Sequence, residues 1–308
     1  MYDTIKLYHR FDNGKPNIDN VMANMTSIKE VYHDTGTHYT QGRYKNIVVN
    51  YNEQSMSLEG SLPKYYYGNN LETLTMSASE VAIQSLSDLI GYDLSNSVVS
   101  RVDFSTNILT QYTPKYYYNY LGKLSRFVRS ESGDSLYYNQ QSKNLIFYNK
   151  IKEAKKKQMP IPKEFENKNV LRYELAIKKN LAKFCKRTIL VKDLYKRDIY
   201  NLFLYKWQEL YTNIDKQKNN IEIMTNNIQT PKDFEVQLLA GLIKQVGYLK
   251  VENLIEQMKV RKTFQHNEYY SRLKSKFRKM SKQEIDNSDI INEINTKVNN
   301  VVLMQEVS

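Results

Sequence analysis

Short stretches in which apolar and polar residues alternate recur through the first 180 residues, and this pattern is typical of half-buried β-strands. Turn residues separate the stretches, as they do in hairpins. The clearest predicted strands cover residues 46–51, 55–62, 98–104 and 170–177, and a hairpin is predicted over residues 135–148. Apolar residues at helical spacing predict a helix that begins near Ser77 or Ser79 and ends before Gly91.

Beyond residue 180 the strand pattern disappears and the chain becomes rich in lysine and helical in its periodicity. The firmest predicted helices cover residues 191–211 and 234–245. Residues 281–308 are polar and only weakly periodic, so we expect them to fray. The pattern predicts an α+β protein: an N-terminal domain over residues 1–180, with a mixed or antiparallel sheet and packed helices, and a mainly helical part over residues 181–308.

The composition adds a strong positive charge, because the 308 residues carry a formal net charge of +12 and include 26 tyrosines. Lysine and arginine gain affinity for nucleic acid by displacing counterions from phosphates, so nucleic acid is the first candidate partner. An anionic membrane surface is the second. A merely soluble basic protein is the plain alternative.

Cysteine content and the N-terminal segment indicate a cytoplasmic protein. Cys185 is the only cysteine, so no disulfide can form within the chain. The first residues show no signal-peptide pattern, and no apolar run approaches the ~20 residues that span a bilayer. We therefore expect a bacterial cytoplasmic location and no membrane partner.

Several common catalytic signatures are missing from the sequence. It contains no GxxxxGK[ST], GxSxG, HExxH or CxxC string, and its four histidines include no H-x-H pair. Nucleotide hydrolysis and zinc hydrolysis are therefore not supported, nor is a metal site built on two histidines.

Two strand-borne strings could place carboxylates together. Arg101 and Asp103 lie two residues apart, as do Arg172 and Glu174, so each pair points to one face of its strand. Asp103 and Glu174, on adjacent strands, could hold one hard divalent cation through oxygen ligands. The alternative is that each string is an ordinary same-face ion pair.

A tyrosine beside such a site could attack a phosphodiester. Tyr148 lies where a predicted strand gives way to a basic helix, with Lys150 two residues further on. Its phenol has an ordinary pKa near ~10, so a metal or lysine must favour the phenolate. Lys150 could do this or neutralise the phosphate in the transition state. Tyr148 could equally be a strand-end aromatic, and Lys155, Lys156 and Lys157 a solvated helix face.

Four blocks of the sequence, in this order, resemble the gene II/X family of replication initiators from filamentous phages and small plasmids. They are residues 60–70 (GSLPKYYYGNN), 99–107 (VSRVDFSTN), 145–153 (LIFYNKIKE) and 170–178 (VLRYELAIK). Similar strings occur in plasmid initiators and conjugative relaxases of the Rep_trans type. The resemblance implies nicking of the plus-strand origin, attachment to the 5′ phosphate and release of a 3′ primer for rolling-circle synthesis, with Mg²⁺ or Mn²⁺ as cofactor.

The resemblance also implies roles for individual residues. It places the nucleophile at Tyr148 with Lys150 beside it, and the metal at Asp103 and Glu174. Glu59 and Glu153 are candidates for a third ligand. Tyr137 and Tyr138 are rival nucleophiles, and no second strand-transferring tyrosine is identified. The predicted DNA contacts are Arg101, Arg172, Lys155, Lys156, Lys157, Arg272 and Lys276.

Two further interpretations stay open at this point. A non-catalytic DNA-binding protein is the alternative to a nicking enzyme. A tyrosine recombinase is disfavoured, because that chemistry needs a phosphate-binding site rich in Arg and His and no metal, whereas this sequence has carboxylates on its predicted strands. Residues 234–258 have the spacing of a helix-turn-helix that would read the origin, although a plain three-helix unit fits as well. The implied partners are origin DNA with a single-stranded or cruciform nick site, host helicase and polymerase, and a second copy of the chain.

Overall fold

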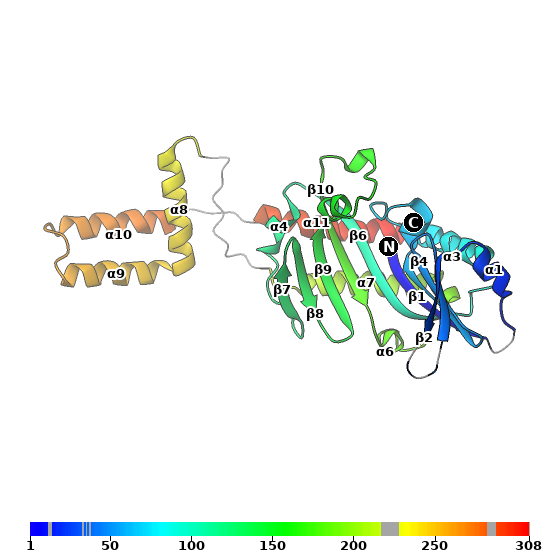
Figure 1. Cartoon of the computed structure of the whole chain (residues 1–308). Coiled ribbons are helices and arrows are strands. Elements are labelled where there is room, and N and C mark those ends of the chain that lie inside the picture. The colour runs from blue at the N-terminus through cyan, green and yellow to red at the C-terminus, as the bar shows by residue number, and fades with distance from the viewer. Residues whose placement is uncertain are drawn as a thin grey trace. The chain divides into compact units, whose positions relative to one another are not determined.

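A computed structural model describes residues 1–11, 14–32, 34, 36, 38–216, 228–281 and 288–307. The chain forms two compact units (Figure 1). Unit 1 comprises Met1–Asp215 and Glu293–Ser308, and unit 2 comprises Lys216–Asn292. The division therefore falls after Asp215 and not near Asn180, and the chain returns to unit 1 at its C-terminal end.

Unit 1 is built on an antiparallel sheet. Within the described residues the sheet has ten strands in the order β2-β3-β4-β5-β1-β6-β10-β9-β8-β7 (Figure 1). The strands are β1 (Tyr2–Arg10), β2 (Thr26–Tyr32), β3 (His38–Tyr44), β4 (Ile47–Tyr51), β5 (Ser55–Ser61), β6 (Val98–Thr110), β7 (Val128–Ser132), β8 (Ser135–Asn139), β9 (Lys143–Asn149) and β10 (Asn169–Ile177). The predicted α+β class with an antiparallel sheet is confirmed.

Helices surround this sheet and make up unit 2. They are α1 (Ile18–Ala23), α2 (Leu62–Tyr67), α3 (Met76–Ile90), α4 (Pro114–Tyr118), α5 (Lys150–Lys156), α6 (Leu181–Cys185), α7 (Arg197–Thr212), α8 (Pro231–Val246), α9 (Tyr248–Val260), α10 (Glu268–Ser281) and α11 (Ser288–Val307). Two short 3₁₀ turns cover Lys163–Phe165 and Val191–Asp193. No helix in the described part of the chain is both long and apolar enough to cross a membrane.

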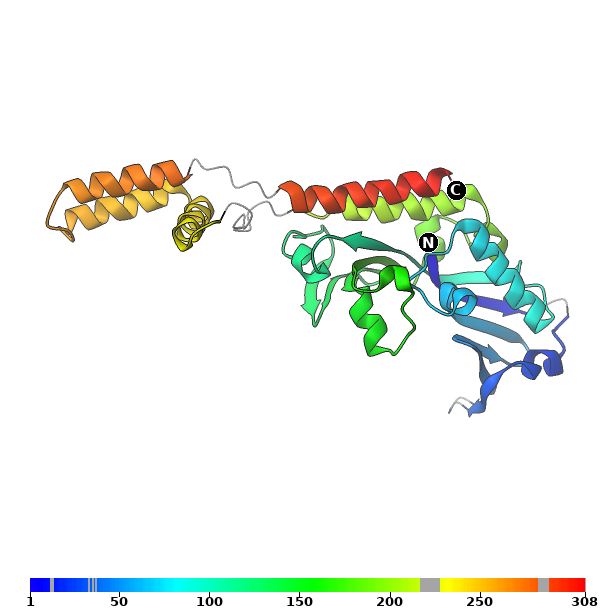
Figure 2. The same ribbon diagram turned by 90° about the horizontal axis from the view of Figure 1, so that it is seen from above.

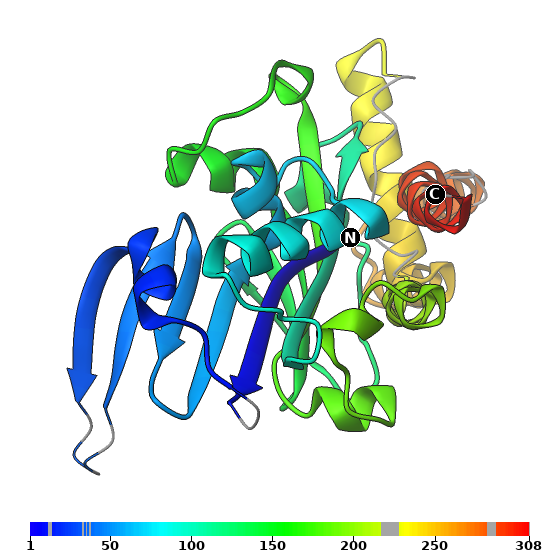
Figure 3. The same ribbon diagram turned by 90° about the vertical axis from the view of Figure 1, so that its right-hand side faces the viewer.

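Helix α3 crosses the strands obliquely (Figure 3, cyan). The hydroxyl of Thr75 caps it by accepting a hydrogen bond from the Ala78 amide, so the cap lies before the predicted Ser77 or Ser79. Gly91 ends the helix as predicted, because its φ of 67° lies in the left-handed region that favours glycine.

Helices α7 and α11 lie side by side along unit 1 (Figure 2, yellow-green and red). Aromatic rings join α7 to one face of the sheet: Phe203 stacks on Phe104 with ring centroids 5.9 Å apart, and Trp207 lies 4.6 Å from the Tyr173 ring. Helix α11 is well formed, so the predicted fraying of residues 281–308 is wrong for 288–307. It buries the side chains of Ile290, Ile291, Ile294, Val298 and Val302, which form a narrow apolar stripe along an otherwise polar helix.

The described part of unit 2 contains the three helices α8, α9 and α10 and the first residues of α11. Their shared core comprises Ala240, Ile243 and Met280, with Leu239 and Phe277 packed against it. Thr230 and Asp233 form a capping box at the start of α8. Helices α8 and α9 meet at Gly247, where the sequence predicts a turn, and α10 packs against both.

Candidate active site

The candidate site lies on the sheet face opposite α7. Successive residues of a strand point to opposite faces, so Asp103 faces away from α7 because its neighbour Phe104 packs against that helix. The same argument places Glu174 opposite Tyr173. Strand pairing then aligns Arg172 with Tyr148 on β9. Three strands, β6, β10 and β9, therefore bring the predicted residues to one face.

These side chains share a pocket of about 340 Å³. It is lined by residues of strands β1, β5, β6, β8, β9 and β10 and by the segments that follow β5 and β9. The lining residues are Asp3, Thr4, Ser61, Lys64, Asn70, Arg101, Asp103, Ser135, Tyr137, Ile146, Tyr148, Glu153, Lys157 and Glu174. The predicted nucleophile and both predicted metal ligands thus lie together in one pocket. In the sequence they are spread over 71 positions, from Asp103 to Glu174.

Asp103 and Glu174 form an acidic pair whose charge is incompletely balanced. Burial, followed by the nearby Asp103 and Asp3 carboxylates, raises the pKa of Glu174 to about 7 against the opposing effect of Arg172. Burial also raises the pKa of Asp103, although Arg101 opposes it through hydrogen bonds of 3.0 and 2.6 Å. Oxygen donors that lack a full counter-charge suit a hard divalent cation. The two carboxylates therefore fit Mg²⁺ or Mn²⁺.

A third carboxylate, Asp3, lies near this pair, but Arg172 and Ser61 both donate to it. In the described part of the chain, no three His, Cys, Asp or Glu side chains cluster as metal ligands. Glu59 instead pairs with Lys6 at 3.0 Å and with Arg101 at 2.8 Å. Glu153 pairs with Lys150 and Lys157. Neither predicted third ligand is thus placed for the role.

Tyr148 stands at the end of β9, half-buried in the pocket wall. Burial raises the pKa of its phenol well above the usual value, while the Arg172 charge acts in the opposite direction. Lys150 begins α5, so the strand does not continue as far as that residue. Its ammonium lies 5.8 Å from the centre of the Tyr148 ring. The nitrogen is fully buried, donates to Asn70 Oδ1 and Glu153 Oε2 at 2.6 Å each, and does not line the pocket.

The two rival tyrosines are separated by the pleat of β8. Tyr138 is buried on the other face, and its hydroxyl donates to the carbonyl oxygens of Leu121 at 2.9 Å and Gly122 at 2.8 Å. Its hydroxyl is thus turned away from the pocket. Tyr137 does line the pocket with Tyr148 and is the remaining rival.

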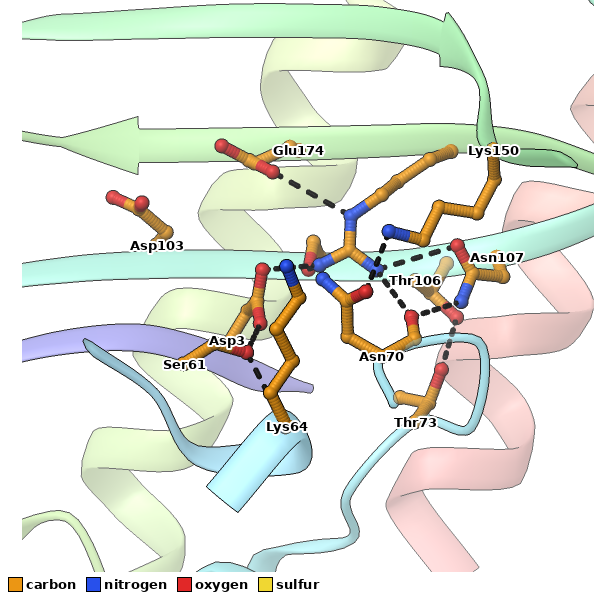
Figure 4. Close-up of polar contacts among 12 residues, drawn as sticks. Asp3, Ser61, Lys64, Asn70, Thr73, Asp103, Thr106, Asn107, Lys150 and Glu174 are labelled. Atoms are coloured by element: carbon orange, nitrogen blue, oxygen red, sulfur yellow. Dashed lines mark hydrogen bonds and ion pairs between the residues drawn. The ribbon is translucent and has the colours of Figure 1, made fainter. Parts of the chain in front are cut away.

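A buried hydrogen-bond network that the sequence does not predict lies behind the pocket (Figure 4). Arg172 is 2% exposed and ion-pairs with Asp3. It also donates to Ser105 Oγ at 2.6 Å and to the Asn70 carbonyl at 3.1 Å. Asn70 belongs to the family-like block 60–70, which is the one signal in the sequence that points to it. The predicted DNA contact by Arg172 is not supported, because a buried guanidinium with these partners cannot reach a phosphate.

The other predicted DNA contacts lie at different places. Lys155 and Lys156 are exposed on the last turn of α5, and Lys157 pairs with Glu153 at 2.5 Å. Arg101 is partly buried between Glu59 and Asp103. Arg272 and Lys276 are exposed on α10 in unit 2, where Arg272 bonds to Glu268 at 3.2 Å. The predicted DNA contacts are therefore divided between unit 1 and unit 2, and those of unit 1 differ in burial and in ion pairing.

Comparison with known proteins identifies the family of the chain. The family model for the N-terminal part of the gene II replication-associated protein of phages matches residues 1–196. This match is more than half of the chain and includes Asp103, Tyr148 and Glu174. A search of the curated proteins found no match. The resemblance seen in the four sequence blocks is confirmed, and the chain belongs to this family of phage replication-associated proteins.

Proposed function

We propose that this replication-associated protein initiates rolling-circle replication by cutting one strand at the origin with Tyr148, in a reaction that needs Mg²⁺ or Mn²⁺. The observation that carries the proposal is the shared pocket, which brings Tyr148 together with two carboxylates whose pKa values are raised. Perturbed titratable groups that converge in a cleft are typical of catalytic sites.

The proposed reaction is a transesterification. The Tyr148 oxygen attacks the scissile phosphorus and loses its proton, and the P–O3′ bond breaks. The 5′ phosphate stays on the tyrosine, and the departing 3′ oxygen takes up a proton to become the primer hydroxyl. Asp103 and Glu174 would hold Mg²⁺ or Mn²⁺, which when bound supplies positive charge for the phosphate and the phenolate.

Arg172 supports this chemistry from behind the pocket. It pairs with Tyr148 across β9 and β10, and its guanidinium is fixed by Asp3 and Ser105. A fixed buried cation beside a phenol favours the phenolate, which is the direction in which Arg172 shifts the pKa of Tyr148. Arg172 is thus a positioning residue that keeps the nucleophile in place and eases its deprotonation.

The test uses supercoiled plasmid that carries the cognate origin, with Mg²⁺, Mn²⁺ or EDTA. Wild-type protein should produce relaxed circles and protein-linked 5′ ends only when the metal and the origin are both present. Tyr148→Phe should abolish both products, because it removes the attacking oxygen and leaves the ring. Tyr137→Phe is the matched control from the same pocket and should still cut.

The other outcomes identify the error. Cutting by Tyr148→Phe but not by Tyr137→Phe would move the nucleophile to Tyr137. Origin binding without any cutting would favour a non-catalytic DNA-binding protein, in which Asp103 and Glu174 merely accept from Arg101 and Arg172.

A further inference from the structure

Five basic side chains lie in or behind the pocket, and they differ in burial and in their ion-pair partners. Lys150 and Arg172 are 0% and 2% exposed and form part of the wall behind the lining residues. Lys64, Arg101 and Lys157 line the pocket itself. A phosphate that enters the pocket can therefore meet the last three but not the first two.

Two of the three lining cations are already bound to carboxylates. Arg101 donates to Asp103 at 2.6 Å and to Glu59 at 2.8 Å. Lys157 pairs with Glu153 at 2.5 Å. The positive charge of each is therefore already shared with a carboxylate, which weakens its attraction for a phosphate.

Lys64 differs from both. Among the residues that the structure describes, it forms no ion pair, although its half-buried side chain reaches the pocket. Figure 4 shows it extending from α2 toward Asp3 and Asn70. The Asp3 carboxylate is itself occupied, since Arg172 and Ser61 both donate to it. Lys64 is thus a positive charge at the pocket wall whose donors remain available.

Helix α2 fixes the place of Lys64. The Ser61 hydroxyl accepts from the Lys64 amide at 3.5 Å, and Pro63 lies in the first turn. Gly68 ends the helix with a φ of 79°, and its amide donates to the Lys64 carbonyl at 3.1 Å. The two residues that cap this short helix therefore both bond to the backbone of Lys64, which fixes its position beside the strands that carry the site.

We propose that Lys64 is the phosphate-binding cation of this site: its ammonium donates to a non-bridging oxygen of the scissile phosphate while Tyr148 attacks the phosphorus. This assignment rests on the proposed function and replaces Lys150, which holds Asn70 and Glu153 in place instead. Charge that develops on the phosphoryl oxygens in the transition state is stabilised by a fixed, charged donor in a partly water-excluded pocket.

The first experiment measures phosphate contact without cutting. Full-length Tyr148→Phe protein is titrated with a fluorescent single-stranded oligonucleotide that spans the nick site, at several KCl concentrations and in EDTA. Each neutralised phosphate contributes about 0.7 to the slope of log K against log salt for single strands. Adding Lys64→Gln should lower the slope by about 0.7 and weaken binding, whereas adding Lys64→Arg should restore both.

The control for this experiment is Lys45→Gln in the same Tyr148→Phe background. Lys45 contacts α2 through the Tyr65 carbonyl at 3.0 Å but does not line the pocket, so the slope should not change. A slope that Lys64→Gln leaves unchanged would overturn the assignment of Lys64.

The second experiment measures single-turnover nicking in Mg²⁺ with Tyr148 intact. Lys64→Gln should slow it about 10²-fold at saturating DNA, and Lys64→Arg should recover most of the rate. Full-rate nicking by Lys64→Gln with an unchanged salt slope would remove Lys64 and leave the tyrosine mechanism standing. A lowered salt slope with no nicking by wild type would do the reverse, since the phosphate contact would stand without the chemistry.

Discussion

The Lys150 ammonium works against folding at neutral pH. It is fully buried, and burial, followed by the Arg172 charge, lowers its pKa to about 8 from the ordinary 10.5. Between these two values the unfolded chain binds a proton that the folded chain does not. The contribution of Lys150 to the free energy of unfolding therefore increases as the pH is raised from about 8 to about 10.5.

Lys150→Met should remove this pH dependence. A difference of 2.5 pKa units between the two values corresponds to about 3 kcal/mol at 1.36 kcal/mol per unit. We expect wild type to gain about that much unfolding free energy relative to Lys150→Met between pH 7.5 and 10.5, measured by urea denaturation. Lys152→Met removes an exposed lysine from the same helix and should run parallel to wild type. Parallel curves for Lys150→Met as well would contradict the prediction.

At the scale of elements, α7 forms the back of the sheet that carries the site. Trp207 is fully buried and faces Tyr173, and the two residues exchange hydrogen bonds: the Tyr173 hydroxyl donates to the Trp207 carbonyl at 2.9 Å and Trp207 Nε1 donates to the Tyr173 carbonyl at 3.4 Å. Tyr173 is the neighbour of both Arg172 and Glu174. The packing of α7 therefore fixes the strand on which the metal and positioning residues lie.

Replacing Trp207 by alanine should destabilise unit 1 by about 3–5 kcal/mol, because it leaves a large cavity behind β10. Tyr205→Ala is the matched control on the same helix, since Tyr205 is 46% exposed, and it should cost less than about 1 kcal/mol. Thermal and urea unfolding measure both. Equal costs for the two variants would show that α7 does not hold β10 in this way.

The elements that the sequence predicts well are those whose local pattern matches their environment. β4, β5, β8 and β9 alternate because one face of each is buried, and β10 is marked by its run of apolar residues. The sequence does not predict β7, because that strand lies at the edge of the sheet, with Val128 70% exposed and no buried face to impose a period. The alternation of apolar and polar residues thus indicates a strand with one buried face, and it does not reveal a strand that has no buried face.

The site shows the same limit. Asp103 and Glu174 can be paired from the sequence because an R-x-D or R-x-E string on a strand fixes a face. Asp3 and Lys64 cannot be assigned to the pocket from the sequence. Their place there depends on the position of β1 between β5 and β6, which no local spacing encodes. Lys150 follows Tyr148 closely enough to be predicted in the pocket, but the start of α5 turns it into the wall.

At the scale of the whole molecule, unit 2 is inserted between two helices of unit 1. Helix α7 precedes it and α11 follows it, and the two helices contact each other near the point of insertion through Tyr211 and Asn295, whose side chains bond at 2.7 Å. Near their far ends Tyr200 bonds to Gln305. The insertion therefore begins and ends at neighbouring points, so unit 1 does not depend on unit 2 for continuity.

This arrangement predicts opposite results for two deletions. A variant in which a short Gly/Ser linker replaces residues 216–287 keeps α7 and α11. It should unfold cooperatively and still cut a single-stranded oligonucleotide through Tyr148 in Mg²⁺. A variant that ends at Asn180 loses both helices and exposes Phe104 and Tyr173, so it should give no cooperative transition in calorimetry.

We expect the first variant to lose its preference for the origin, because the deletion removes the exposed basic residues of α10, including Arg272 and Lys276. An unchanged ratio of origin to non-origin cutting would show that unit 1 reads the origin itself.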